Sequence, residues 1–489
     1  MSWRNIVDRL LGRHKKSPQG AQKSVAKDVN LEIVAPVKQG SDRKTEKKLS
    51  PEATQLPGSH PGLQKQQLFI GLDFGTAFTK VVIGESRVRY VVPFAADAKK
   101  NVTCLPCEYF VTENGHSSLA RVRSSDEKVT NLKMPLIEGR SNDEQRAKII
   151  VFLALALQQI RNWLLTSQAK VYQGKNINWH INIGLPTEKF DEDHEMVTIY
   201  RQIVQSAWYL SAGDESITQT RALDALEKVS LGMNSNSLKF QEGERWIHPE
   251  NINCFPEFVA MVSGYVRSPR RQDDLHLLVD IGAGTADVTV FNVHKNEEED
   301  VFPIFAKGVR PLGAAYLLLH RFEQLGKKTL VDATMPVPDD ASFCKTYGIA
   351  EKDLNEVDQS FQKEFHRLVA EQLKRVKIHR YPNSRRWKNG IPCFISGGGK
   401  DIELYVRVLK KMQKPDFPYR ISLDSLFCPR DLQGARIQDE EFSRILVAYG
   451  LSVDPFDIGK IIKSQDVPDD DPPPRRSTYE DSFPGKEVT

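Results

Sequence analysis

Residues 68–84 and 277–291 repeat one pattern: an apolar strand carrying an aspartate, a turn rich in glycine and threonine, and a second apolar strand. The first copy is LFIGLDFGTAFTKVVIG and the second is LLVDIGAGTADVTVF. Each copy predicts a β-hairpin. A single Gly-Thr turn is common in β proteins, but a matched pair in one chain is stronger evidence, because two such hairpins can face one another.

The two turns have the composition of an anion site. Glycines let the backbone adopt positive φ and approach a ligand, so successive N–H groups can form an anion nest, to which threonine hydroxyls add donors. The neighbouring aspartates suit a hydrated magnesium ion between phosphates and protein. A third glycine turn follows the predicted strand 391–395, where the backbone could pass close to a flat base and its ribose.

Together these segments resemble the ATPase domain of the actin, sugar-kinase and heat-shock-chaperone superfamily, most closely that of DnaK-type chaperones. The resemblance spans residues 67 to about 460. Its strongest matches are the first phosphate loop (73–79), the second phosphate loop (280–287) and the adenosine loop (396–399). Weaker matches follow in the family's order. Residues 130–139 resemble the segment with an active-site lysine, and 181–186 resemble a buried strand. Residues 256–260 and 447–450 resemble the two connecting helices, and 308–313 resemble the segment after the second phosphate loop.

The resemblance implies an α/β protein with a two-lobed actin-like ATPase fold, duplicated mixed sheets and a central nucleotide cleft. The expected domains are a basic N-terminal tail (1–65) with a short amphipathic helix, a first lobe (66–275), a second lobe (276–465) and an acidic, proline-rich tail (466–489). The first lobe carries an extended segment near 213–255. Relative to the family pattern, Ala283 replaces a glycine, and the peptide-binding domain of the chaperones is expected to be absent after Gly450.

The resemblance also implies the site residues and the cofactors ATP or ADP and Mg²⁺. Glu257, Lys133 and Asp280 are the expected catalytic residues, and Asp73, Asp280 and Asp287 the expected magnesium site. From the residues alone, Glu257 could instead be a helix-start carboxylate near the positive end of its dipole, and Lys133 a solvated surface lysine. The expected nucleotide-binding residues are Asp73, Gly75, Thr76, Ala77, Gly282, Gly284, Thr285, Gly397, Gly398 and Gly399.

Three functions remain open on one such frame. The first is a slow ATPase switch, chaperone-like, that changes lobe closure and so acts through a partner protein. The second is an actin-like or cell-division filament or scaffold protein, which would need a self-complementary surface. The third, ranked last, is a small-molecule kinase, because no sugar-binding cluster is evident beside the first loop.

Composition limits the remaining possibilities. A net charge of +4 over 489 residues does not favour nucleic acid as a partner. The apolar run 149–157 is too short to cross a bilayer and predicts a buried helix. Six scattered cysteines fit a reducing compartment, so a cytoplasmic location is expected. The pair Cys104 and Cys107 has the spacing of half a zinc site or a redox motif, but ordinary core thiols are favoured.

The first sixteen residues form a basic amphipathic segment. Trp3, Ile6, Val7, Leu10 and Leu11 fall on one helical face, among five nearby Lys and Arg side chains. Such a segment could bind an anionic membrane weakly or enter a partner's groove, with oligomerisation adding avidity. It could equally be a short helix that docks on its own protein or frays.

Overall fold

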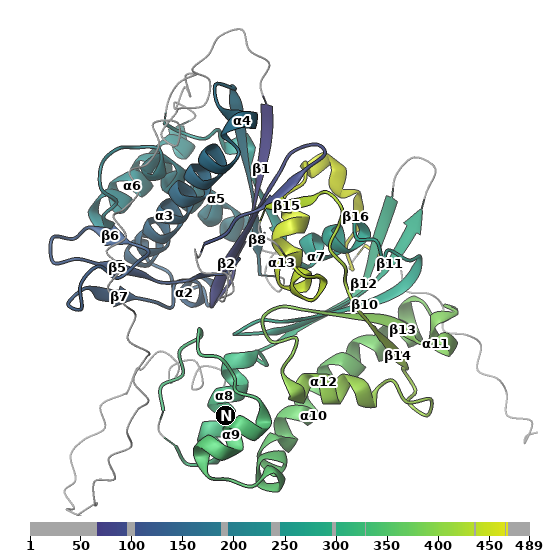
Figure 1. The fold of residues 1–489 in the computed structure, drawn as a ribbon. Coiled ribbons are helices and arrows are strands. Elements are labelled where there is room, and N and C mark those ends of the chain that lie inside the picture. Colours follow the sequence, from purple (N-terminus) through teal and green to yellow (C-terminus); the bar gives the residue numbers. More distant parts are fainter. Residues whose placement is uncertain are drawn as a thin grey trace, which may run out of the picture.

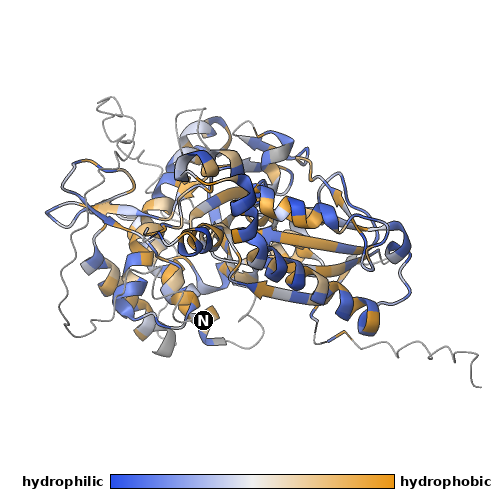
Figure 2. Ribbon diagram, turned by 90° about the horizontal axis from the view of Figure 1, so that it is seen from below, coloured by the Kyte–Doolittle hydropathy of each residue, from blue (hydrophilic) through white to orange (hydrophobic). Residues whose placement is uncertain are grey.

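The computed structural model describes residues 66–94, 103–186, 194–235, 245–295, 300–327, 329–434, 437–464 and 466–467. Two mixed β-sheets, each covered by helices, form two lobes with further helices between them (Figure 1). Apolar residues concentrate along the central strands (Figure 2). The predicted helix near the N-terminus and the tail beyond 467 lie outside the described residues.

The first sheet has the strand order β15-β3-β2-β1-β8-β9. β1 pairs antiparallel with β2, and β2 with β3, whereas β8 lies parallel to β1, β9 parallel to β8, and β15 parallel to β3. Its strands are β1 (Gln66–Phe74), β2 (Phe78–Gly84), β3 (Arg89–Val91), β8 (Ile177–Leu185), β9 (Ile252–Pro256) and β15 (Leu432–Gly434), with β4 (Leu105–Pro106) added beside β2.

The second sheet repeats this plan strand for strand, in the order β14-β13-β10-β11-β12-β16. The antiparallel pairs are β10 with β11 and β11 with β12, and the parallel pairs are β10 with β13, β13 with β14, and β12 with β16. The prediction of two lobes with duplicated mixed sheets is therefore confirmed. The strands are β10 (Asp274–Ile281), β11 (Ala286–Lys295), β12 (Asp300–Arg310), β13 (Ile391–Ser396), β14 (Ile421–Asp424) and β16 (Lys460–Ile462).

Helices cover both sheets, and a small sheet β6-β5-β7 adjoins the first lobe. In the first lobe lie α2 (Met134–Ile137), α3 (Asp143–Ser167), α4 (Ala169–Tyr172), α5 (His194–Ser211), α6 (Gln219–Ser235), η2 (Pro249–Asn251), β5 (Tyr109–Val111), β6 (Ser117–Ser118) and β7 (Glu127–Val129). In the second lie α8 (Ala314–Gln324), α9 (Asp340–Tyr347), α10 (Glu351–Arg375), the π-turn η3 (Val376–Arg380), α11 (Arg386–Asn389) and α12 (Glu403–Lys411). Between the lobes lie α7 (Glu257–Val266) and α13 (Asp439–Leu451), followed by η4 (Pro455–Ile458).

Helix α3 is longer than the apolar run 149–157 suggested. Its 25 residues make it long and apolar enough to span a membrane by composition, but 67% of the apolar window is buried in the first lobe. It packs against α5 and α6. The expectation of a buried helix holds, whereas the argument from its short length was wrong.

The chain does not divide once between the lobes. Strand β15 joins the first sheet and α13 packs on β1 and β2, although 276–465 was expected to form the second lobe. Asn182 of β8 fixes this return, because its buried amide donates to the carbonyls of Leu451 and Val453 at 2.7 and 2.8 Å. The physical reason is that α13 must fill the space between two sheets.

Helices α7 and α13 cross where each carries a glycine. A Cβ added at Gly450 would lie 1.8 Å from the Ala260 carbonyl oxygen, and one at Gly264 would lie 2.8 Å from the Leu446 carbonyl oxygen. The two backbones are therefore in direct contact. Apolar residues of both sheets, including Val82 and Phe291, pack with this helix pair in one buried cluster.

We predict that Gly450→Ala destabilises the unliganded protein. Overpacking of a filled core costs about 1–3 kcal/mol, and the helix propensity of alanine would otherwise favour the change by about 1 kcal/mol. Urea unfolding measures the loss. The matched control is Gly398→Ala, because a Cβ there meets nothing within 4 Å. Equal stability of Gly450→Ala and the wild type would show that the helices do not cross this closely.

Candidate functional site

A cleft of about 1350 Å³ lies between the lobes. The structure brings every sequence-predicted site residue to its lining, although their roles stay predictions. From the first lobe come Asp73, Gly75, Thr76, Ala77 and Lys133, from α7 Glu257, and from the second lobe Asp280, Gly282, Gly284, Thr285, Asp287, Gly397, Gly398 and Gly399.

The carbonyls of the second turn are held by the start of α8. The Gly282 and Ala283 carbonyls accept from the N–H groups of Ala314 and Ala315, both at 2.9 Å, at the start of α8. Because a trans peptide holds its N–H opposite its C=O, the amides of Ala283 and Gly284 point away from α8. Gly313 permits this approach, since a Cβ there would lie 2.5 Å from the Ala283 oxygen.

Cys107 orders the first turn in a comparable way. Its backbone N–H donates to the Ala77 carbonyl at 2.8 Å, and its thiol donates to the Gly75 carbonyl at 3.1 Å. The trans peptide then turns the Thr76 amide away from Cys107. Cys107 is 2% exposed and burial raises its pKa to about 12, which agrees with a core thiol. Sequence reasoning missed this supporting role, since no local pattern links residues 75 and 107.

The two turns face one another across the cleft. A Cβ added at Gly284 would lie 3.6 Å from Thr76 Oγ1 and 3.8 Å from the sulfur of Met134. The two turns nearly touch, so one ligand that lies alongside both could accept from donors of both lobes. This is the arrangement that binds a polyphosphate chain from two sides.

Lys133 and Glu257 form an ion pair at the base of the cleft, with Nζ 2.7 Å from Oε1. Lys133 precedes α2 and is only 3% exposed, so its interpretation as a solvated surface lysine was wrong. Burial lowers the pKa of Lys133, but the Glu257 carboxylate and other anions outweigh this and raise it overall. Glu257 is the first residue of α7 and its side chain is 16% exposed, so it lines the cleft as well as starting the helix.

Three aspartates gather near this pair. Burial, ahead of the charges of Asp280 and Glu257, raises the pKa of Asp287 well above its ordinary value. Asp280 accepts from Ser396 Oγ at 2.6 Å, and burial raises its pKa to about 6. Asp73 is paired with Lys80 at 3.0 Å. The second lobe therefore holds acidic groups that the protein alone does not fully compensate.

These carboxylates fit a hydrated cation better than a directly ligated one. The Oδ1 atom of Asp287 is buried without a hydrogen-bond partner, and a water on a metal ion would supply one. Within the described ranges, no three His, Cys, Asp or Glu side chains are close enough together to ligate a metal directly. Asp73, Asp280 and Asp287 would thus hold Mg²⁺ through its water shell.

Lys80 is a cleft residue that the sequence reasoning did not nominate. It pairs in register with Asp73 on the adjacent strand, and its side chain is 15% exposed within the cleft lining. The signal was present in the first hairpin, because residues across a tight turn on facing strands share one side of the sheet. A lysine there supplies positive charge beside the first turn.

The glycines after β13 make close contact with the second turn. Gly397 has φ +85°, and a Cβ there would lie 2.4 Å from the Ile281 oxygen. Gly399 donates its N–H to the same oxygen at 2.9 Å. Gly398 faces open space. The loop is therefore fixed at both ends and leaves its middle accessible to a flat ligand.

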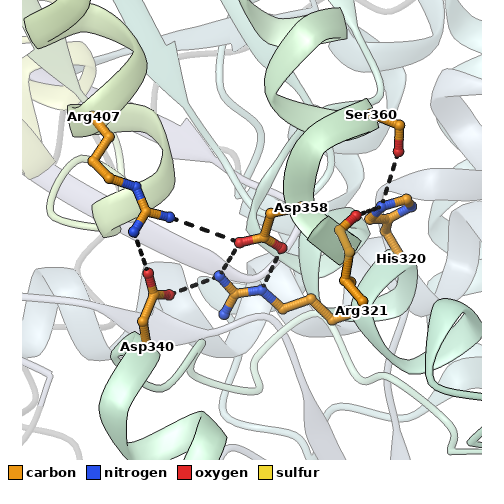
Figure 3. Close-up of polar contacts among 7 residues, drawn as sticks. His320, Arg321, Asp340, Asp358, Ser360 and Arg407 are labelled. Carbon is orange, nitrogen blue, oxygen red and sulfur yellow. Dashed lines mark hydrogen bonds and ion pairs between the residues drawn. The ribbon is translucent and has the colours of Figure 1, made fainter. Parts of the chain in front are cut away.

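A buried ion network stiffens the helices beside this loop (Figure 3). Arg321 of α8 holds Asp358 of α10 through two hydrogen bonds of 2.9 and 2.7 Å, and both side chains are fully buried. Asp340 of α9 joins Arg321 to Arg407 of α12, each at 2.8 Å. Four helices of the second lobe are thus joined, including α12, whose first residue, Glu403, lines the cleft. No sequence pattern predicted this network.

No family model matches the chain, and no curated protein matches it. It is similar to the crystal structure of MreB5 of Spiroplasma citri bound to ADP, with 14% identity, a TM-score of 0.37, and coverage of 78% of this chain and 94% of that one. For the crystal structure of the same protein bound to AMPPNP, the identity is 14%, the TM-score is 0.37, and the match covers 79% of this chain and 95% of that one. For a non-polymerisable quadruple mutant of pCBH ParM, the identity is 15%, the TM-score is 0.39, and the match covers 79% of this chain and 98% of that one.

None of these three structures is a DnaK-type chaperone, so the expected closeness to that family is not shown. At identities of 14–15% and TM-scores of 0.37–0.39, these similarities carry no argument about function. The functional argument therefore rests on the cleft itself.

The raised pKa of Asp280 predicts a pH dependence of stability. Between its ordinary pKa of 3.8 and about 6, the folded protein keeps a proton that the unfolded chain has lost. The retained proton stabilises the folded protein. Its contribution to the free energy of unfolding is fully present below pH 4 and is lost as pH rises through 6. It amounts to on the order of 3 kcal/mol, from about two pKa units at 1.36 kcal/mol each.

Asp280→Asn should remove that component. Urea unfolding of the unliganded protein at pH 4.5 and pH 7 measures it, and wild type should lose more stability over the interval than the variant. Asp416→Asn, at an exposed position, is the control and should behave as wild type. An identical pH dependence in wild type and Asp280→Asn would contradict the burial of this carboxyl.

Proposed function

We propose that the chain binds ATP with Mg²⁺ between its lobes and hydrolyses it slowly. The observation that carries the proposal is convergence: three glycine turns, far apart in the sequence, meet in one cleft beside the Lys133–Glu257 pair. Each turn alone is common. Their joint placement, with facing amides and buried carboxylates, is what a magnesium nucleotide requires.

Residues in different parts of the cleft would bind different parts of the nucleotide. The amides of the first and second turns, with the Thr76 and Thr285 hydroxyls, would donate to the phosphates. Gly397–Gly399 would lie against the nucleoside. Bound magnesium would neutralise phosphate charge, held through water by the three aspartates.

Glu257 would orient the attacking water, since its carboxylate lies in the cleft and Lys133 fixes its direction through the 2.7 Å contact. Lys133 also adds positive charge where negative charge develops on the transferring phosphoryl group.

Glu257→Gln tests the assignment by separating binding from hydrolysis. Magnesium-ATP at about a hundred times its dissociation constant should add roughly 2.7 kcal/mol to the stability of wild type and variant alike, seen as a rise in Tm. Turnover of the variant should fall by about 10²-fold or more, as expected when a positioned carboxylate is lost.

Glu138→Gln is the matched control, because Glu138 also lines the cleft but pairs with Arg140 instead of Lys133. It should bind and hydrolyse as wild type does. Absence of any thermal shift in the wild type would contradict nucleotide binding. Wild-type turnover by Glu257→Gln would remove only the role given to that residue.

Lobe closure around a nucleotide could act on a partner protein or on assembly of the chain with itself. We favour self-assembly as the second candidate function because Phe456 of η4 is 94% exposed on a turn fixed by Asp454, which accepts from the Phe456 N–H at 3.0 Å. An exposed aromatic side chain on a turn whose backbone is fixed is the type of anchor that protein interfaces bury. The alternative is a chaperone-like switch, in which lobe closure changes the binding of a partner protein.

We predict that the protein sediments with ATP and that Phe456→Ser abolishes sedimentation while leaving nucleotide binding intact. Val122→Ser is the control, since Val122 is also exposed but lies on the first lobe away from η4. Ultracentrifugation with ATP, ADP and no nucleotide measures the effect. A monomer under all three conditions would exclude self-assembly and leave the partner-directed switch.

From the sequence we also propose that the basic segment 1–16 contacts an anionic membrane weakly. The proposed location is cytoplasmic and peripheral to a membrane. Co-sedimentation with anionic vesicles tests them.

A further inference from the structure

A strongly basic surface covers the end of the second lobe opposite the cleft. The segment between residues 372 and 400 contains no Asp or Glu. Parallel strands β13 and β14 place their amino ends together, and the segments that precede them, η3 with α11 and the end of α12 with the following turn, carry the charge. The basic surface comprises Lys374, Arg375, Lys377, Arg380, Arg385, Arg386, Lys388, Lys410, Lys411 and Lys414.

Aromatic contacts hold these segments together. Lys377 Nζ lies 4.9 Å from the centre of the Trp387 ring, and that ring meets Tyr419 edge-on at 6.4 Å. Phe417 in turn meets His366 of α10 at 5.5 Å. The basic side chains therefore stand on a fixed frame and not on independent loops.

Few acidic groups oppose this charge. Asp273, Asp274 and Asp416 lie at the same end of the lobe, and Asp274 already accepts from Ser384 Oγ at 3.0 Å. In the part of the chain that the structure describes, no ion pair joins Lys374, Lys388 or Lys410 to a carboxylate. Burial and then the charge of Lys388 lower the pKa of Lys377, as expected where cations crowd together.

The chain after β16 leads to this surface. Val467 is 8% exposed and belongs to the core of the second lobe. Its carbonyl accepts from the Arg380 guanidinium. Pro468 follows and then three consecutive aspartates, Asp469–Asp471. At about 3.5 Å per residue, a stretch of two to four residues spans at most about 7 to 14 Å, so the sequence allows these aspartates to reach the cations of η3 and α11.

We propose that the acidic segment Asp469–Asp471 docks on the basic surface of the same molecule and shields it from other polyanions. Charge complementarity and the anchor at Val467 support this occupant. A tethered segment also has an effective concentration in the millimolar range, which favours it over a separate acidic partner. Because exposed charges are screened over about 8 Å at 0.15 M salt, the docking is reversible and weakens as salt rises.

Carbodiimide cross-linking of the full chain tests the contact directly, because it joins carboxylates to amines only when they touch. The expected product is an intramolecular link between the peptide containing Asp469–Asp471 and one containing Lys374, Lys377 or Lys388, found by mass spectrometry and reduced at high salt. Links from that peptide only to other parts of the chain, or only between molecules, would overturn the proposal.

Heparin, used as a polyanion probe, tests the shielding. One variant carries three changes, Asp469→Asn, Asp470→Asn and Asp471→Asn. It should bind heparin roughly tenfold more tightly than wild type at low salt, because the basic side chains released from the tail can then contact the sulfate groups of heparin. The control pair Glu480→Gln with Asp481→Asn, farther along the tail, should leave affinity unchanged. Adding Lys374→Glu and Lys388→Glu to the triple variant should cancel its gain.

Two results would contradict the shielding: equal heparin affinity in wild type and the triple variant, or an equal gain in the control pair. The latter would show general repulsion by an acidic tail instead of docking by one segment. Neither result depends on nucleotide binding, so this proposal and the proposed function can fail separately.

Discussion

The crossing of α7 and α13 is the contact on which the rest of the structure depends. Gly264 and Gly450 let the two helix backbones touch, and Gly71 and Gly84 let the end of α13 lie directly on the first sheet, where a Cβ would fall 2.2 and 1.7 Å from backbone oxygens. The two lobes therefore share a buried contact between helix backbones. The position of each turn relative to the other is therefore set by this helix pair.

The duplicated hairpins differ in one respect that defines the site. Asp73 and Asp280 occupy matching positions, but the residue paired with each in register is Lys80 in the first lobe and Asp287 in the second. In the first hairpin Lys80 pairs with Asp73, whereas the second hairpin holds two carboxylates whose pKa values are raised, mainly by burial. The proposed cation between the lobes would offset this acidic charge, and we therefore propose that it lies on the side of the second hairpin.

The cleft residues were predicted from the resemblance to the ATPase superfamily. Local turn chemistry supported this prediction only for the three glycine turns and their aspartates, because Lys133 and Glu257 lie in none of these turns. The resemblance also predicted the two connecting helices. The sequence could not predict that Cys107 orders the first turn, that Arg321 joins four helices, or that β15 returns to the first sheet. Each of these depends on residues brought together only by folding, and neither hydrophobic periodicity nor motif spacing carries that information.

An experimentally determined structure of the full chain with Mg²⁺ and a non-hydrolysable ATP analogue tests the central claim most directly. The account predicts phosphate density between the turns at Thr76 and Thr285, magnesium reached through water by Asp287, and the base against Gly398. A nucleotide bound outside the cleft, or one whose phosphates contact neither turn, would contradict it.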